Sequence, residues 1–569
     1  MKTAELLAHA FRAQGVDTVF GIAGDANLEW WAAMHTLGAR MIDTRQELGA
    51  VAMAEGYSQA SGDVGVASVT AGPGLVQSGL AIANAVRAGA AVVVFAGDNP
   101  TTTLEAPQLL DQRRFAEACG AQLVAVRAPH AAAEDVVRAF ELARGLQTCV
   151  VLNAPMDVQA ATVDVDADAI SRTSPASDRT AAVPDDATVV ALIDRISAAQ
   201  RPVVLAGRGA MRADAGPFLV ALAEQIGAAT ATTLLAKGYL DDDPFCLGVV
   251  GPVASAAADD VLATADLVLA FGASLDRFCR FGKPGVPTFP HARVLSVLDP
   301  APAIGIPGVE VLAGDARATA KLLLDRLPST PRMGGLRNAQ VSARLAAEPP
   351  RVGAVSDGVI HPAEAMRVLE RHLTHDQHRV VVGSGHFFSW PVMHLRRPQG
   401  GRFLFAYAFG SIGLGLPIAM GAALGDPSSR VVVVEGDASL MEIVQELETA
   451  SRHQIPVTVV VMNDEQLGAE RFKGELLGLD PALMHIATPR FDEVARAFGG
   501  DGARATDAES MGAALQRAAG SPGAFVVDTR IDPTVLCDMY RKLHFDLPNV
   551  APHQREPRAP SRASVPRTG

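Results

Sequence analysis

Polar side chains follow two apolar runs in the C-terminal third of the chain. Residues 431–434 are four valines that lead into Glu435, Gly436 and Asp437, and residues 457–462 lead into Asn463 and Asp464. The segment between the runs has apolar residues at the spacing of one helical face: Leu440, Ile443, Val444 and Leu447. A strand–helix–strand crossover makes the two strands parallel, so both polar ends are expected at the same edge of a sheet. Ligands of open α/β sheets bind along that edge.

The residue types at these strand ends suit a phosphorylated ligand that is held through a cation. Asp437 and Asp464 carry the oxygen atoms that Mg²⁺ prefers, and Mg²⁺ also takes phosphate oxygens. The backbone amides of Ala438 and Ser439 open the predicted helix and can receive a diphosphate. The alternative is that both aspartates only cap helices. The two strand ends alone leave both interpretations open.

Size, composition and charge narrow the class of protein. The chain has 569 residues, which at roughly 150 residues per domain predicts three or four domains. Its net charge of −13 argues against nucleic acid or an anionic membrane as the main partner. The five cysteines form no CxxC or zinc spacing, so a reducing cytoplasm is expected. The N-terminal stretch is amphipathic rather than a signal peptide, and no apolar stretch reaches the ~18 residues that span a bilayer.

Short β-branched runs alternate with helical patterns along most of the chain. The clearest predicted strands are residues 64–69, 91–96, 149–152, 203–206, 267–271, 380–382, 431–434 and 457–462. They are apolar on both faces, which is typical of parallel strands covered by helices. The polar stretches 171–186 and 327–358 are interpreted as linkers. We therefore expect three doubly wound α/β domains with parallel sheets, at residues 1–170, 187–327 and 359–548, and a disordered tail at 549–569.

The stretch 431–464 resembles the GDG…NN motif of thiamine diphosphate (ThDP) enzymes, here in the form GDAS…ND. In that family the aspartate, the second Asn-type residue and a main-chain carbonyl two positions on hold the metal. The resemblance implies Asp437, Asp464 and Gln466 as the metal ligands, with Gly436, Ala438 and Ser439 at the diphosphate. The departure is Asp464, which stands where asparagine is usual and adds a negative charge close to the diphosphate.

Two N-terminal stretches resemble the other half of that family's site. Residues 43–56, DTRQELGAVAMAEG, resemble the block that carries the catalytic carboxylate, which implies this role for Glu47. The TAGPG turn at 70–74 resembles the family's TSGPG turn and implies Pro73 as a cofactor contact. Gly24 lies in the loop GIAGD, where acetolactate-synthase-like members carry a Y-P-G-G type loop. Taken alone, Glu47 would more often serve the helix dipole, and glycine turns recur in all α/β folds.

Two more C-terminal stretches resemble cofactor loops. VGSGHFFSW at 382–390 falls where the family has its first diphosphate loop, which implies four contacts: Ser384, Gly385, His386 and Phe387. FGSIGLGLP at 409–417 resembles the G-x-M-G-x-G-L-P turn, which implies that the Gly410 carbonyl accepts a hydrogen bond from the aminopyrimidine and that Ile412 bends the cofactor. As isolated residues, His386 would more often be structural and Ile412 would be ordinary core.

The middle of the chain resembles the Rossmann-like central domain of the ThDP decarboxylase–carboligase branch. The matching stretches are residues 201–210, 236–248 and 263–278. That domain binds FAD or ADP in some relatives and nothing in others. No G-x-G-x-x-G fingerprint with a distal acidic residue is present, so an NAD site is not expected. The resemblance runs from about residue 3 to 535 and implies a pyrimidine-binding, a central and a diphosphate-binding domain, in that order.

The resemblance implies a ThDP- and Mg²⁺-dependent decarboxylase or carboligase acting on a small 2-oxo acid. Gln108 is expected to face the substrate, although its neighbours Pro107 and Leu109 replace the Phe and Glu of acetolactate-synthase-like members. Alternatives are a 2-hydroxyacyl-CoA or 2-hydroxyketone lyase, an oxalyl-CoA-type decarboxylase and a non-catalytic regulatory relative. An acyl-CoA substrate would need a basic patch, for which Arg396, Arg397 and Arg402 are the candidates.

Assembly and one further acidic residue complete the expectations. Glu47 and the metal-binding residues lie on different domains, and in the family the active site forms between subunits. A homodimer or homotetramer is therefore expected. Glu470 follows the metal motif in the segment GAERFKGEL, and it is interpreted as part of a solvated helix face rather than of a pocket.

Overall fold

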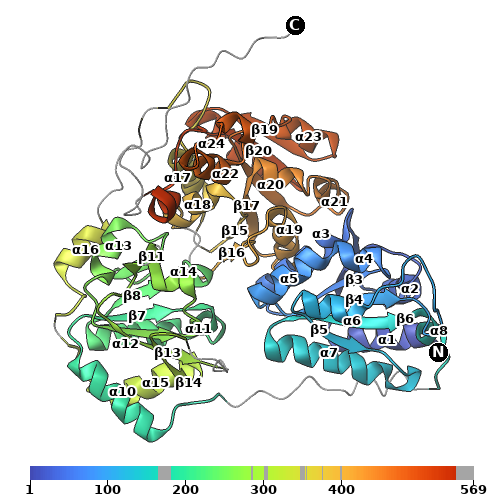
Figure 1. The fold of residues 1–569 in the computed structure, drawn as a ribbon, viewed down its shortest axis with the longest axis horizontal. Helices are drawn as coiled ribbons and strands as arrows, with labels where there is room; N and C mark the ends of the chain where they lie inside the picture. Colours follow the sequence, from blue (N-terminus) through green and yellow to red (C-terminus); the bar gives the residue numbers. More distant parts are fainter. Residues whose placement is uncertain are drawn as a thin grey trace.

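Three six-stranded parallel sheets, each covered by helices, organise the computed structural model (Figure 1). The structure describes residues 1–164, 181–283, 286–299, 306–332, 334–346, 353, 355–374, 376–396 and 400–545. The predicted fold class, α/β with three doubly wound parallel sheets, is confirmed. Most of the first predicted linker and the whole predicted tail at 549–569 lie outside the described residues.

The N-terminal sheet has the strand order β2-β1-β3-β4-β6-β5. Its strands are β1 (Thr18–Gly21), β2 (Arg40–Asp43), β3 (Gly65–Val69), β4 (Val92–Asp98), β5 (Gln122–Ala125) and β6 (Cys149–Pro155). The helices are α1 (Thr3–Ala13), α2 (Leu28–Thr36), α3 (Glu47–Ser61), α4 (Pro73–Gln77), α5 (Gly79–Ala88), α6 (Gln112–Ala118), α7 (Ala132–Leu146) and α8 (Met156–Ala160). The central strands β3 and β4 are apolar and buried, as the β-branched runs predict.

The central sheet has the order β14-β13-β10-β7-β8-β9, which reverses direction between β7 and β10. Its strands are β7 (Pro202–Ala206), β8 (Ala229–Thr232), β9 (Cys246–Val249), β10 (Leu267–Phe271), β13 (Arg293–Leu298) and β14 (Val309–Ala313). The main helices are α10 (Asp186–Ala198), α11 (Arg208–Arg212), α12 (Gly216–Ile226), α13 (Ala256–Leu262), α15 (Ala316–Arg326) and α16 (Ala339–Ala346). This is the Rossmann-like order that the resemblance implies.

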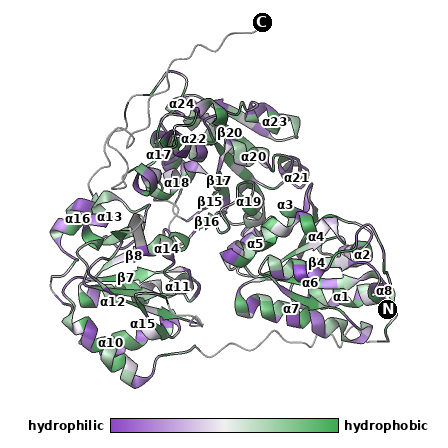
Figure 2. Ribbon diagram, in the orientation of Figure 1, coloured by the Kyte–Doolittle hydropathy of each residue, from purple (hydrophilic) through white to green (hydrophobic). Residues whose placement is uncertain are grey.

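The C-terminal sheet has the order β16-β15-β17-β18-β20-β19, which repeats the order of the N-terminal sheet. Its strands are β15 (His378–Val382), β16 (Phe403–Phe405), β17 (Arg430–Gly436), β18 (Val457–Asn463), β19 (Asp501–Ala505) and β20 (Phe525–Arg530). The main helices are α17 (Pro362–His372), α18 (Ser389–His394), α19 (Gly415–Gly425), α20 (Asp437–Met441), α21 (Glu446–Arg452), α22 (Gly468–Leu476), α23 (Phe491–Ala497) and α24 (Ala508–Ala518). Figure 2 shows apolar strands at the centre of each domain and polar residues on the outer helices.

The crossover between β17 and β18 differs from the single helix that the apolar spacing predicts. The strands are parallel and adjacent, as expected, with Val434 in register with Val460. The crossover itself is two short helices, α20 and α21, because the residues between them form tight i→i+3 turns. Leu440, Ile443 and Leu447 are nevertheless all buried, so the apolar pattern marks the buried face correctly.

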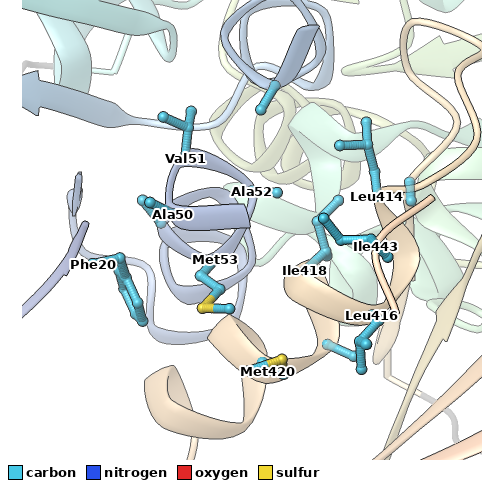
Figure 3. Close-up of a cluster of buried hydrophobic side chains, with 14 of the residues drawn as sticks. Phe20, Ala50, Val51, Ala52, Met53, Leu414, Leu416, Ile418, Met420 and Ile443 are labelled. Atoms are coloured by element: carbon cyan, nitrogen blue, oxygen red, sulfur yellow. The ribbon is translucent and has the colours of Figure 1, made fainter. Parts of the chain in front are cut away.

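The N- and C-terminal domains share one hydrophobic core. Figure 3 shows Met53 of α3 close to Met420 of α19, and both belong to one buried cluster that also includes Ala50 and Ile418. The two helices approach at glycines: a Cβ atom on Gly56 would lie 1.9 Å from the carbonyl oxygen of Ile418. This close crossing fixes the two domains of one chain against each other. No helix among the described residues is long and apolar enough to cross a membrane.

Candidate active site

A cavity of about 310 Å³ lies where β15, β17 and β18 end. It is lined by all but one of the residues that the sequence predicts for the C-terminal half of the site: Ser384, Gly385, His386, Phe387, Ile412, Gly436, Asp437, Ala438, Ser439, Asp464 and Gln466. The exception is Gly410, which lies in the same loop as Ile412 but outside the lining. Residues from several separate segments therefore meet around one cavity, as the strand–crossover–strand argument predicts.

Asp437 joins the two strand ends directly. Its Oδ1 accepts a hydrogen bond from the amide of Ala438 at 2.9 Å, and its Oδ2 accepts one from the amide of Glu465 at 2.8 Å. The second bond ties the end of β17 to the loop after β18. Asp464 accepts hydrogen bonds from the amide and the side chain of Gln466, both at 3.3 Å. Because Gln466 precedes α22, these bonds do not cap that helix.

The electrostatics of this pair fit a bound cation. Burial raises the pKa of both Asp437 and Asp464, and the negative charge of Asp437 raises the pKa of Asp464 further. Two buried carboxyl groups side by side are costly unless a positive charge lies between them. No group of three or more His, Cys, Asp or Glu in the described part of the chain is placed to hold a metal. A cation here would therefore take its remaining ligands from a main-chain oxygen and from phosphate.

The loop after β18 is held in a strained shape. Glu465 has φ 57°, which is unusual for a residue with a side chain and costs roughly 1–3 kcal/mol. Arg530 makes two contacts that fix this loop, an ion pair with Glu465 at 2.8 Å and a hydrogen bond to Asn463 Oδ1 at 2.8 Å. Asn463 also donates to Asp528 at 2.8 Å and does not line the cavity. Of the polar pair after β18, only Asp464 therefore reaches the site.

His386 combines a structural role with a place in the cavity wall. Its ring packs against Phe472 and Tyr540, with ring centroids at 4.7 and 5.1 Å. Its Nε2 lies 3.4 Å from the amide of Cys537, which donates to it. Burial and the nearby charge of Arg471 lower the pKa of His386 to about 3, so the ring is neutral at physiological pH. Because Nε2 accepts, Nδ1 carries the proton of the neutral ring and can donate a hydrogen bond, but the ring adds no positive charge.

The loop that carries Gly410 and Ile412 is held from two sides. The amide of Gly413 donates to Ser439 Oγ at 2.9 Å, which links the loop to the end of β17. The amide of Phe409 donates to Asn84 Oδ1 of the N-terminal domain at 3.0 Å. Asn84 in turn donates to both carboxylate oxygens of the fully buried Glu55, at 3.1 and 2.9 Å. Sequence reasoning missed both residues: Asn84 belongs to no recognised motif, and Glu55 lies in the stretch 43–56, where the resemblance gives a role to Glu47 alone.

The four residues predicted for the N-terminal half of the site gather at a different place. A Cβ atom on Gly24 would lie 2.7 Å from Thr70 Cβ, and one on Gly74, next to Pro73, would lie 3.5 Å from Glu47 Oε1. A Cβ atom on Gly72 would lie 2.4 Å from the carbonyl oxygen of Gln108. None of these residues lines the cavity of the same chain. The structure thus gathers the residues of each half but does not join the two halves within one chain.

Glu446 is a second residue that sequence reasoning missed. This residue begins α21, and its Oε1 accepts hydrogen bonds from the amides of Arg45 and Gln46, at 3.1 and 3.0 Å. It therefore holds the start of α3, where Glu47 lies, from the C-terminal domain of the same chain. Burial raises the pKa of Glu446 to about 7. The only signal in the sequence is a carboxylate directly beside the apolar face of the crossover.

Glu470 corrects an expectation. The sequence places it on a solvated helix face, but it lines the cavity from the first turn of α22. Its side chain is half exposed and pairs with Lys473 at 3.1 Å. Leu467, Gly468 and Ala469 line the cavity beside it. The solvated character is thus partly right, because the carboxylate lies at an open part of the wall.

Family models match all three parts of the chain. They are the thiamine pyrophosphate enzyme N-terminal TPP binding domain at residues 1–115, the central domain at 189–323 and the C-terminal TPP binding domain at 383–529. The chain is 31% identical to an acetolactate synthase large subunit of Parasynechococcus marenigrum over 563 residues, covering 93% of this chain and 87% of that protein.

Two other similar proteins are named for different activities. A probable 2-ketoarginine decarboxylase of Pseudomonas aeruginosa is 29% identical, with 91% of each chain covered. The solved structure of a ThDP-dependent 4-hydroxybenzoylformate decarboxylase of Rhodococcus jostii superposes with a TM-score of 0.80 at 22% identity, covering 94% of this chain and 99% of the other, which shows the shared fold. With three matching domains in order and a relative above 30% identity, the chain belongs to the thiamine pyrophosphate enzymes and is an enzyme of decarboxylation or carboligation that depends on this cofactor.

Proposed function

We propose that the protein uses ThDP and Mg²⁺ to decarboxylate a small 2-oxo acid or to join it to a second carbonyl compound. The observation that carries this proposal is the pair of neighbouring carboxyl groups, the buried Asp437 and the partly buried Asp464, beside a cavity with helix-start amides. ThDP, when bound, supplies a carbanion that adds to carbonyl groups and a ring that takes up electrons. The chain has to bind that cofactor, orient it and manage one proton.

Each half of the site has its own task in this proposal. Asp437, Asp464 and the carbonyl of Gln466 hold Mg²⁺, and the amides of Ala438 and Ser439 face the diphosphate. Further contacts come from Ser384, Gly385, His386, Phe387, Gly410, Ile412 and Gly436. Glu47 holds a proton at the pyrimidine ring, Gly24 and Pro73 shape its surroundings, and Gln108 faces the substrate. Closure of the two halves around the cofactor would exclude water.

The two halves need two copies of the chain. Glu47 begins α3. Glu55 lies eight residues further along α3 and is hydrogen-bonded to Asn84, which in turn bonds to the loop of Gly410 and Ile412. At 1.5 Å per residue these points are about 12 Å apart along the helix. Exposed apolar side chains flank both halves, such as Leu109 at 53% and Leu483 at 73% exposure. These features support a homodimer or homotetramer with each site shared between subunits. The five free cysteines favour a reducing compartment such as the cytoplasm.

Complementation between two inactive variants tests this assembly. Glu47→Gln lacks the proton group and Asp437→Ala lacks the metal ligand, so homodimers of either are inactive. Mixed dimers carry one site with both defects and one intact site, so subunit exchange should restore activity. The control is Glu47→Gln mixed with Glu47→Gln carrying a different affinity tag, which restores nothing. Verified mixed dimers without activity would show that each site forms within a single chain.

The charge around the cavity bears on the donor substrate. Asp437, Asp464 and Glu470 are acidic, and no Lys or Arg is among the described lining residues. Mg²⁺ would balance the first two, which leaves Glu470 at the open part of the cavity, where Lys473 pairs with it at 3.1 Å. Because no Lys or Arg lines the described cavity, we favour a 2-oxo acid with a neutral or basic side chain over one with a second acidic group. A relative named as a 2-ketoarginine decarboxylase is in keeping with this choice.

A donor panel separates these substrates. Carbon dioxide release would be measured with pyruvate, 2-oxohexanoate, 2-ketoarginine and 2-oxoadipate, each with ThDP and Mg²⁺, and ligated products would be sought with added aldehydes. We expect the highest kcat/KM for a neutral or basic donor. Glu470→Gln should narrow the difference between 2-ketoarginine and 2-oxoadipate. No release with any donor would contradict the proposed reaction.

Acyl-CoA chemistry, as in a 2-hydroxyacyl-CoA lyase or an oxalyl-CoA decarboxylase, has less support. Arg402 donates to Ser429 at 2.7 Å, and Arg396 is exposed, and neither lines the cavity. Arg397 lies outside the described residues. The gathered Glu47 and Asp437 half-sites also weigh against a non-catalytic regulatory relative.

A nucleotide bound to the central domain and the limits of the three domains remain predictions. The loops after β7 and β10 pack against each other, with the amide of Gly209 donating to the Gly272 carbonyl at 2.9 Å. This contact accounts for the glycines there without a nucleotide, so FAD or ADP is not required by the described loops. Absorbance near 450 nm and chromatography of the denatured protein would detect either. The limits 1–170, 187–327 and 359–548 stay predictions, and α16 (Ala339–Ala346), which packs on the central domain, lies in the stretch 327–358 that the sequence predicts as a linker.

A further inference from the structure

Glu435 is a buried acid that none of the roles above uses. It lies two residues before the metal-binding Asp437, and its side chain is completely buried. Its Oε1 accepts a hydrogen bond from the amide of Gly436 at 3.2 Å. Its Oε2 makes no hydrogen bond of good geometry to the described residues. A buried carboxyl group with an incomplete set of partners opposes folding, so its presence needs a local reason.

Two glycines lie directly against this carboxyl group and leave no room for a side chain of their own. A Cβ atom on Gly383 would lie 2.1 Å from Glu435 Oε1, and one on Gly415 would lie 2.0 Å from Oε2. Any other residue at either position would displace the carboxyl group. Gly383 follows β15 and Gly415 begins α19, so the side chain of Glu435 lies between two segments that are far apart in the sequence.

The side chain of Glu435 contacts three segments that form the cavity wall. One follows β15, one follows β17 and one precedes α19. Gly383 opens the loop of Ser384 and Gly385, and Gly415 closes the loop of Ile412. The third segment follows Glu435 itself and leads into α20, where the hydroxyl of Ser439 interacts with the carboxyl group of Glu435 and accepts a hydrogen bond from the amide of Gly413. Glu435 does not line the cavity. It is placed behind the wall, at the point where the three loops meet.

We propose that Glu435 is a positioning residue whose carboxyl group holds the three cofactor loops at the spacing that ThDP needs. This inference rests on the proposed function, since it takes the cavity to be the ThDP site. The carboxyl group faces the start of α19, whose first amides are free to donate, and it thereby fixes where the Ile412 loop begins. Loss of one acceptor oxygen or of one methylene group would loosen that loop relative to Ser384 and Ser439.

Two substitutions test the role. Glu435→Gln keeps the size but turns an NH₂ group toward the amides of α19 or Gly436. Glu435→Asp keeps the carboxyl group but withdraws it from Gly383 and Gly415. Either variant should weaken ThDP binding in the presence of Mg²⁺ by about 10- to 100-fold, the usual effect of losing a group that orients site ligands. Calorimetry of the full-length protein measures this loss.

Hydrogen–deuterium exchange of the cofactor-free protein gives a second readout. We expect faster exchange in peptides covering 383–389 and 409–417, with other peptides of the domain unchanged. Asp492→Asn is the matched control, because Asp492 is a buried acid of the same domain that pairs with Arg490 and Arg496 away from the cavity. It should lower the melting temperature and leave both ThDP affinity and loop exchange as in the wild type.

The outcomes separate this inference from the proposed function. Folded Glu435 variants with wild-type ThDP affinity and wild-type exchange in both loops would overturn the positioning role. Uniformly faster exchange across the whole domain, with no excess in these two loops, would show a general structural role and overturn it as well. Failure of the wild type to bind ThDP would instead contradict the proposed function, while the exchange measurement would still decide whether Glu435 holds the loops.

Discussion

The N- and C-terminal domains have the same strand order but carry different chemistry at the same edge of the sheet. In both, a helix follows the second strand in the sequence, and these helices, α3 and α19, pack against each other. The start of α3 carries Glu47, whereas the loop before α19 carries Ile412. Each start faces a buried glutamate of the C-terminal domain, Glu446 for α3 and Glu435 for α19. The two domains therefore share a strand order but carry different functional groups at the starts of their packed helices.

The difference between the two edges indicates a division of labour. The C-terminal edge has a buried and a partly buried carboxyl group together with helix-start amides, which is what a metal and a diphosphate need. The N-terminal edge has glycines, one half-buried glutamate and no comparable carboxylate pair in the cluster described above. We therefore expect substitutions at the C-terminal edge to abolish cofactor binding and those at the N-terminal edge to slow turnover with the cofactor still bound.

The largest effect is expected at the N-terminal edge. Glu47→Gln should slow turnover by about 10²–10⁴-fold, the usual contribution of a positioned acid–base group, and leave ThDP affinity nearly unchanged. The amide has the same size but cannot share a proton with the pyrimidine ring. Steady-state kinetics and calorimetry on the same preparation measure both quantities. Unchanged turnover with a lowered melting temperature would show that Glu47 only serves the dipole of α3, which is worth about 0.3–1 kcal/mol.

The next effect is expected at the C-terminal edge. Asp437→Ala should weaken Mg²⁺-dependent ThDP binding by about 10²–10³-fold, because removing one partner of a buried charged contact costs roughly 3–5 kcal/mol. Asp464→Asn is the matched control, since it keeps a ligand oxygen, restores the residue usual in the family and removes one negative charge. Its ThDP affinity should stay within a few-fold of wild type. Equal losses in both variants would mean that Asp464 needs its charge.

The sequence was sufficient for the fold class and for the C-terminal half of the site. The valine runs before Asp437 and Asp464 predict adjacent parallel strands, and β17 and β18 are adjacent and parallel. The convergence of Asp437 with the loop of Asp464 follows from that geometry alone. Both depend on short-range patterns and on the fixed rules of parallel crossovers, which a single sequence contains.

Contacts between domains could not be predicted in this way. Glu446 and Glu55 each bond to a backbone or side chain that only the tertiary fold brings close, and neither belongs to a repeated spacing. Glu470 looks like a surface residue in its helical pattern because its carboxylate is half exposed, and only the fold shows the cavity beside it. The crossover breaks into α20 and α21 for local hydrogen-bonding reasons that apolar spacing does not record.

The contact between Glu446 and the start of α3 predicts a dependence of stability on pH. Burial raises the pKa of Glu446 from 4.5 to about 7. Between these values the native state holds a proton that the unfolded chain has released, so stability falls as pH rises through this window. The total is roughly 3 kcal/mol, because one pKa unit corresponds to about 1.4 kcal/mol.

Glu446→Gln removes that proton from the balance. Urea unfolding of wild type and variant at pH 5 and pH 7.5 should show the variant gaining relative stability at the higher pH, by up to roughly 3 kcal/mol. Its ability to accept from Arg45 and Gln46 is kept by the amide oxygen, so the contact itself survives. Parallel stability profiles for the two proteins would show that Glu446 is ionised in the native state throughout.

The smallest effect concerns the helix crossing that joins the compared domains. Gly56→Ala should lower the free energy of unfolding by about 1–3 kcal/mol, because the new methyl group would meet the Ile418 carbonyl at 1.9 Å and force α3 and α19 apart. Gly145→Ala in α7 is the matched control: nothing lies within 4 Å of its new Cβ atom, and alanine favours a helix by roughly 0.5–1 kcal/mol. Opposite signs of the two changes in urea unfolding would show that the crossing, rather than loss of glycine, sets the cost. A stabilised Gly56→Ala protein would mean that the close contact between α3 and α19 at Gly56 does not hold the two domains together.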